Sequence, residues 1–149
     1  MFAGLRDELA GRRWLYAGLV ATVFFAFFME GVARLILGGP LKPAVLLCQV
    51  LGWDLEFLWL AEIIHYFSVI IVLPLIFLIF RRPLWWAGSV VAGLIWGALI
   101  WYGGAAHAAP SVGISPFYGG GNVMYASLAG HLIYGVVLGY LMPSIRGKA

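Results

Sequence analysis

The sequence predicts an all-α integral membrane protein, an up-down-up-down four-helix bundle with a short interfacial helix between helices one and two. Two observations predict this class. Of the 149 residues, 64% are hydrophobic and only 10% are charged, against about 25% charged in an ordinary soluble domain. Four separate apolar runs are also long enough to cross a bilayer core, which takes about 20 helical residues. The length allows one domain, residues 1–149.

The four runs predict transmembrane helices at about 14–37, 56–80, 84–106 and 122–142. The first ends at Gly38, Gly39 and Pro40, residues that stop helices. Pro74 lies inside the second and predicts a kink there. Only Arg81, Arg82 and Pro83 separate the second run from the third. These two helices are therefore expected to form an antiparallel hairpin.

Two shorter features complete the predicted fold. The run from Pro43 to Leu51 is too short to span a membrane, so it predicts an interfacial helix. Two small-residue notches follow later in the chain, Gly93-x-x-x-Gly97 and Gly135-x-x-x-Gly139. Such notches let helix backbones approach closely. The spacing alone leaves open whether they serve internal packing or a partner's helix.

The basic residues predict the orientation, because short cytoplasmic loops carry an excess of Lys and Arg. One set of loop and terminal positions holds all but one of these loop charges, and Lys42 stands alone on the other side. Both termini are therefore expected in the cytoplasm, with the chain crossing a bacterial inner membrane several times. The basic residues of this set are Arg6, Arg12, Arg13, Arg81, Arg82, Arg146 and Lys148.

Charge and cysteine content exclude other classes of protein. The formal net charge is +3, and the basic residues behind it lie at helix ends. This distribution does not indicate a nucleic-acid partner. The single Cys48 excludes an internal disulfide framework and a site built from several cysteines. The expected surroundings are the lipid bilayer and other membrane protein subunits.

Ionisable residues of three predicted helices fall at one depth in the outer half of the bilayer. Counting inward at about 1.5 Å per residue puts Glu30 about 12 Å deep and Glu62 about 9 Å deep. His65 and His131 both lie about 13 Å deep, and Arg34 is one turn from Glu30. Ionisable groups inside a membrane are costly and mark functional sites by default.

Small residues accompany both of these histidines. Ser127 and Gly135 share the helix face of His131, and Ala61 and Ser68 share that of His65. A face of histidine and small residues leaves room for something other than side chains, which favours a bound group at this depth.

The first interpretation of the cluster is a haem b site. His65 and His131 supply the two axial ligands, and the porphyrin lies between the second and fourth helices. Arg34 meets the haem propionates, with Lys42 or His107 nearer the surface.

The second interpretation is a metal centre for Zn, Cu, Mn or non-haem Fe. Glu62 and His65 form the i, i+3 pair found in helical-bundle metal sites. Glu30 and His131 complete a shell of oxygen and nitrogen ligands of the kind that these metals accept.

The third interpretation is purely structural, with no cofactor. Glu30 then pairs with Arg34 at i, i+4, and His65 donates to Glu62 or to a backbone carbonyl. His131 bonds Ser127 or a neighbouring tyrosine, Tyr66 or Tyr134, and the polar groups hold the helices together.

These interpretations predict a small integral membrane subunit of a redox complex, with a non-catalytic assembly subunit as the alternative. Enzyme activity of the chain by itself has the least support.

Three short stretches resemble a known group of proteins. They are LAGHLIYGVVLG at 128–139, GLVAT at 18–22, and an isolated histidine in the second helix. The layout and these motifs resemble small, uncharacterised four-helix inner-membrane proteins of bacteria. This resemblance implies a four-helix inner-membrane fold, and the group offers no agreed activity to carry over.

Overall fold

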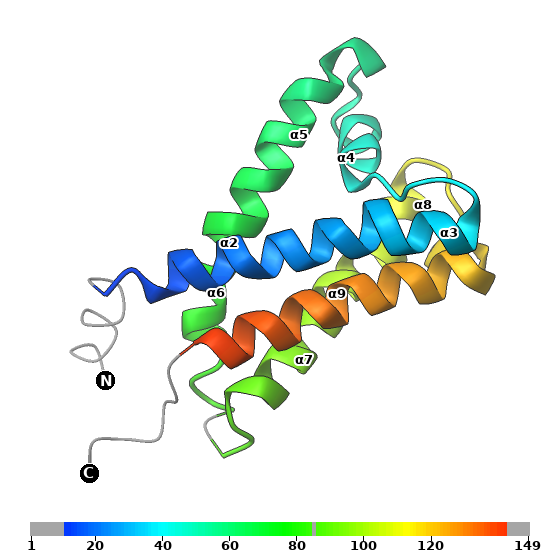
Figure 1. Ribbon diagram of the computed structural model, residues 1–149. Coiled ribbons are helices and arrows are strands. Elements are labelled where there is room, and N and C mark those ends of the chain that lie inside the picture. Colours follow the sequence, from blue (N-terminus) through cyan, green and yellow to red (C-terminus); the bar gives the residue numbers. More distant parts are fainter. Residues whose placement is uncertain (1–10, 85, 143–149) are drawn as a thin grey trace.

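The computed structural model describes residues 11–84 and 86–142, and within these ranges every regular element is a helix (Figure 1). Four helices are long and apolar enough to cross a membrane. They confirm the predicted all-α class and indicate a membrane protein, and they are called spans one to four below. Their bounds are Arg13–Leu37, Leu55–Phe80, Ser89–Ser111 and Gly121–Leu141.

Span one consists of α2 (Arg13–Ala26), a π-helical segment (Phe27–Val32) and α3 (Ala33–Leu37). It ends at Gly38, whose φ of 74° is a left-handed conformation that glycine adopts without strain. The short helix expected between the first two spans is α4 (Pro43–Leu51). It begins with Pro43 in its first turn, where the missing N–H of proline leaves no helical bond unmade.

Span two has two halves with different neighbours. Its N-terminal half, α5 (Leu58–Phe67), packs on α4 through the small side chains of Ala44, Cys48 and Ala61. In Figure 1 this half rises away from α2 beside α4. Its C-terminal half, α6 (Leu73–Phe80), packs on α2. Span two therefore contacts α4 along its first half and α2 along its second.

Pro74 explains the change at the middle of span two. The segment Ser68–Val72 just before it is π-helical, and the Leu73 N–H donates to the Ser68 carbonyl, five residues back. Pro74 has no N–H to donate. The disturbance expected at Pro74 thus takes the form of a π-helical segment. Here α2 comes very close, since a Cβ on Gly18 would overlap the Ile70 carbonyl and the Pro74 ring.

Span three is displaced from its predicted position. It comprises α7 (Ser89–Gly103), a π-helical segment (Gly104–Ala108) and α8 (Ala109–Ser111), so it begins and ends five residues later than 84–106. Gly88, with φ of 80°, holds the chain out of the helix at the start. At the end, the helix continues past Pro110 because the Ala109 N–H donates to the Gly104 carbonyl in a π turn.

The two glycine notches face each other between α7 and α9 (Gly121–Leu141). A Cβ on Gly93 would overlap the Gly135 carbonyl, and one on Gly135 would overlap the Gly93 carbonyl. One turn along, a Cβ on Gly97 would overlap the carbonyl of His131. The notches therefore serve internal packing, which settles the question that their spacing left open.

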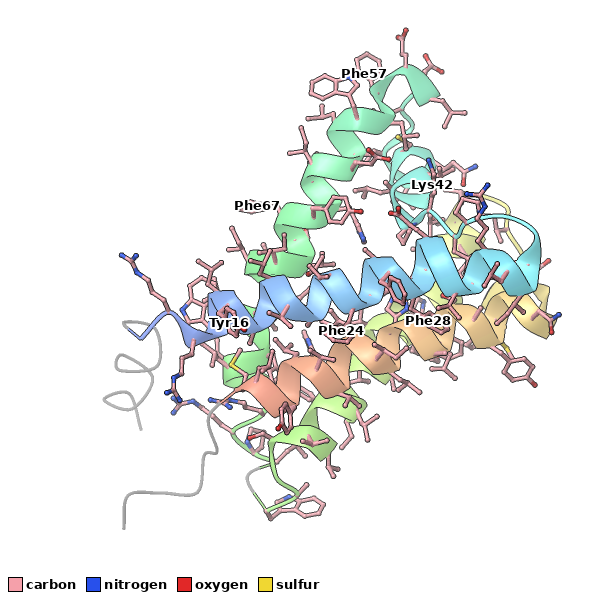
Figure 2. The ribbon with its side chains drawn as sticks, in the orientation of Figure 1. Tyr16, Phe24, Phe28, Lys42, Phe57 and Phe67 are labelled. Atoms are coloured by element: carbon pink, nitrogen blue, oxygen red, sulfur yellow. The ribbon has the colours of Figure 1, made fainter. Side chains whose placement is uncertain are left out.

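The remaining core joins α2, α6 and α9. Figure 1 shows α2 and α9 side by side and running in opposite directions, so the described chain starts and ends at the same end of the molecule. Buried core residues from these helices include Phe25, Phe77 and Leu138, joined by Met29 of the π-helical segment that follows α2. Large apolar side chains such as Tyr16, Phe24 and Phe67, labelled in Figure 2, are exposed, as expected of helices that face lipid.

Candidate functional site

A cavity of about 160 Å³ lies at the level where the histidines meet. All four spans contribute to its wall: α2 one residue, span two four, α7 one and α9 two. The lining residues are Phe25, His65, Ser68, Val69, Leu73, Ile100, His131 and Tyr134. The structure thus brings His65 and His131 into one cavity, as their equal depth suggested.

Phe25 stands beside both histidines. Its ring centroid is 6.2 Å from that of His65 and 5.2 Å from that of His131, where the two rings meet edge to face. It also contacts the Tyr134 ring at 6.3 Å. This side chain is buried and forms an aromatic wall of the cavity.

A hydrogen bond to the backbone fixes the tautomer of the His131 imidazole. Its Nδ1 lies 2.7 Å from the Ser127 carbonyl oxygen, one turn earlier in α9. A carbonyl oxygen only accepts, so Nδ1 carries the proton and donates it. In the neutral ring, Nε2 is then left with a lone pair. The close contact of Gly97 with the His131 carbonyl holds the same residue from the other side.

Tyr134 ties span four to the break in span two. Its hydroxyl donates to the Val69 carbonyl at 2.7 Å, and both residues are buried. That carbonyl needs an outside donor because the Leu73 N–H is used by Ser68 and the next residue is Pro74. The Ser68 hydroxyl donates in turn to the Ile64 carbonyl at 2.7 Å.

His65 is held less tightly than His131. Its ring lies 5.7 Å from that of Tyr66, centroid to centroid. Within the part of the chain that the structure describes, its ring nitrogens make no hydrogen bond. The side chain is half-buried. Both of its ring nitrogens are therefore available to a ligand.

The charged residues predicted for the site do not line the cavity. Glu30 and Arg34 are both exposed, and Glu30 accepts a hydrogen bond from the Tyr66 hydroxyl at 3.1 Å. Glu62 is half-buried and also lies outside the cavity wall. Among the residues described, no three His, Cys, Asp or Glu side chains gather closely enough to hold a metal ion. The shell expected from Glu30, Glu62, His65 and His131 is not assembled in this structure.

A second feature, at Tyr118, lies just before the N-terminal end of span four. Phe117 and Tyr118 adopt positive φ angles of 53° and 58°, a conformation unfavourable for bulky residues. Burial raises the pKa of the Tyr118 phenol, and its hydrogen bond with Ser127 opposes that shift. His107 is exposed and packs on Tyr102 at 5.6 Å between ring centroids, away from the cavity.

Residues 9–149 match the model of a family of unknown function (DUF6789). The chain belongs to this family. The match covers both histidines and every residue of the cavity wall, which agrees with the resemblance to an uncharacterised group. Neither the curated proteins nor the solved structures contain a match to this DUF6789 chain.

The sequence of this DUF6789 member did not reveal the apolar part of the site. Phe25, Leu73 and Ile100 are large apolar residues among many in their spans, and no pattern distinguishes those that turn inward. One feature of the sequence could have indicated the role of the Val69 carbonyl: Pro74 follows it by five residues. A proline removes a backbone donor, so a nearby carbonyl must find another.

Proposed function

We propose that the protein is a small integral membrane subunit of a redox complex, and that the cavity between His65 and His131 is its cofactor site. The observation that carries this proposal is the convergence of the two histidines, from spans two and four, on one cavity. Polar groups are expensive at membrane depth and are retained there for function by default. Four of the eight residues that line the cavity carry polar side chains: His65, Ser68, His131 and Tyr134.

The state of His131 supports ligand binding. Histidines that hold a ligand through Nε2 are usually oriented by an Nδ1–H bond to a carbonyl or carboxylate. His131 has that bond with the Ser127 carbonyl. Its Nε2 lone pair is therefore preorganised, at no further cost when a ligand arrives.

The size of the cavity favours a small cofactor. An engineered cavity of about 150 Å³ accepts benzene, and the cavity here is about 160 Å³. A porphyrin is several times larger than benzene, and Phe25 occupies the space beside both imidazoles. Haem b therefore does not fit unless Phe25 withdraws, and Arg34 is not placed to meet its propionates. A metal ion would find only two of the four expected ligands. A cofactor with a single ring fits best.

The membrane setting belongs to the same proposal. An up-down-up-down arrangement of the spans is supported by α2 and α9 running in opposite directions (Figure 1). The bias of basic residues supports cytoplasmic termini and a bacterial inner membrane. The site then lies in the half of the bilayer away from the cytoplasm.

A cofactor-free assembly subunit is the second candidate, and one observation favours it. Tyr134 bonds the Val69 carbonyl and Tyr66 bonds Glu30, so several polar groups join one span to another. Such bonds stabilise a bundle without any ligand.

The content of redox-active groups in the purified protein separates the two candidates. We would purify the protein in mild detergent after expression with haem supplied. A reduced-minus-oxidised spectrum, elemental analysis and solvent extraction would then be recorded for wild type, His65→Leu, His131→Leu and the control His107→Leu. His107 is suitable because it is exposed and outside the cavity.

We expect a redox-active group in wild type and His107→Leu, and its loss in both cavity variants. Haem bands in wild type would instead show that Phe25 moves aside. A wild type without any redox-active group, or equal content in all four proteins, would support the assembly subunit.

A further inference from the structure

The hydrogen-bond donors around the His65–His131 cavity are almost all committed to the protein backbone. The Tyr134 hydroxyl donates to Val69, the Ser68 hydroxyl to Ile64, and His131 Nδ1 to Ser127, each at 2.7 Å. Each of these groups has only one proton to donate. What they have left is lone pairs, on two hydroxyl oxygens and on His131 Nε2.

A cavity rich in free acceptors selects a ligand that donates. A buried acceptor left without a partner loses its water without compensation, and a second acceptor placed against it adds repulsion. Among the side chains that line the cavity, only the half-buried His65 keeps an uncommitted N–H. The matching ligand therefore presents O–H or N–H groups rather than carbonyls alone.

The charge of the lining requires a neutral ligand. None of the eight lining residues is acidic, and none is Lys or Arg. An ion transferred to such a site would lose its hydration without gaining an opposite charge. This argues against a free metal cation and against an anion such as phosphate.

The shape and surroundings of the cavity point to one aromatic ring that enters from the bilayer. Its volume suits a single six-membered ring, and Phe25 offers a ring face or edge to pack against. Five of the eight lining residues are only half-buried, so the cavity is not sealed. At this depth the molecules next to an unsealed cavity are lipid chains, along which an apolar tail can extend.

We propose that the cavity binds the ring of a membrane quinol, a neutral aromatic ring with two opposed hydroxyls and an apolar tail. This inference rests on the proposed cofactor site and names the class of its ligand. His131 Nε2 accepts a hydrogen bond from one hydroxyl, and His65 pairs with the hydroxyl at the opposite side of the ring. The oxidised quinone carries two carbonyls in their place, so it has nothing to donate to His131. The proposal concerns binding and assigns no electron-transfer step to this chain.

Calorimetric titration of the whole protein in detergent tests the preference. The probes are decyl-hydroquinone under reducing conditions, the matching decyl-benzoquinone, and the dimethyl ether of the hydroquinone. The ether keeps the ring and tail but has no O–H, so it tests donation without any mutation. His131→Phe removes the acceptor and keeps a ring, and His107→Phe is the matched control.

We expect wild type and His107→Phe to bind the hydroquinone about tenfold more tightly than the quinone or the ether, the loss of one buried hydrogen bond. In His131→Phe the three affinities should become nearly equal. Equal affinities in wild type, or tighter binding of the quinone, would overturn the ligand assignment.

Absence of binding is also decisive. If no probe binds while a redox-active group still co-purifies in a His65- and His131-dependent way, the quinol assignment fails and the cofactor site stands. If neither is observed, both proposals fail.

Discussion

At the scale of single residues, the properties of the site depend on which backbone carbonyls accept hydrogen bonds from its side chains. His131 is fixed by the Ser127 carbonyl, and Tyr134 by a carbonyl that Pro74 leaves without its helical donor. Neither bond is made to a ligand, yet each determines what the cavity still offers. The hydrogen-bonding groups that the site still offers to a ligand are therefore set by backbone geometry on two different spans.

Removing the Tyr134 hydroxyl should leave the Val69 carbonyl without a partner. We expect Tyr134→Phe to lower the free energy of unfolding by about 1 kcal/mol, typical of a hydrogen bond between membrane helices. The matched control is Tyr140→Phe on the same helix, since Tyr140 is 76% exposed and Tyr134 only 2%. Thermal midpoints in detergent, followed by tryptophan fluorescence, measure the difference. Equal midpoints for the two variants would remove the Tyr134–Val69 bond from the account.

At the scale of elements, helix contact is set by glycines and helix geometry by prolines. The paired notches bring α7 and α9 together so closely that the carbonyl of His131 lies against Gly97. Two π-helical segments each end two residues before a proline, Pro74 in span two and Pro110 in span three. Of these features, the Gly97 contact with His131 and the π-helical segment before Pro74 border the cavity.

A methyl group on Gly97 should separate the two helices. We expect Gly97→Ala to destabilise the protein by about 1–3 kcal/mol, because the new Cβ meets backbone that has no room to move. Gly103→Ala is the control on the same helix, with nothing within 4 Å of the added Cβ. It should be neutral or stabilising by up to about 1 kcal/mol. The same thermal midpoints report both, and a harmless Gly97→Ala would contradict the close contact of α7 with α9.

The sequence predicted more of the elements than of their arrangement. The apolar runs and breakers gave spans one, two and four to within a residue, and they gave α4 with its observed bounds. They misplaced span three, because hydropathy does not report that Gly88 holds the chain outside the helix or that a π turn carries it past Pro110.

The sequence likewise predicted only part of the site. Equal depth predicted that His65 and His131 would meet, since rise per residue is fixed in a helix. Rotation about the helix axis is not fixed by depth, so Glu30, Glu62 and Arg34 were expected in a cavity that they do not line. Phe25 carried no signal at all among the aromatic residues of its span.

At the scale of the whole molecule, the chain has four helices long and apolar enough to cross a membrane, and all four contribute to the cavity wall. The expected orientation places that cavity in the outer half, with the termini inside. Ser111, at the end of span three, is exposed and should then face outward.

Single cysteines test this orientation. In a Cys48→Ser background, Ser111→Cys should react with a membrane-impermeant maleimide in intact cells, and Lys148→Cys should react only after lysis. Cys48 is the sole native cysteine and is buried, so its replacement leaves a clean background. The opposite labelling pattern would invert the orientation and place the cavity in the cytoplasmic half.

Nitrogen NMR of histidine-labelled protein tests the central claim most directly, because the chain has only three histidines. Single substitutions assign the ring signals, and decyl-hydroquinone is then titrated into wild type. We predict that the ring nitrogens of His65 and His131 shift together with one midpoint, while those of His107 stay in place. Shifts at only one cavity histidine, or none at either, would contradict a single site shared by spans two and four.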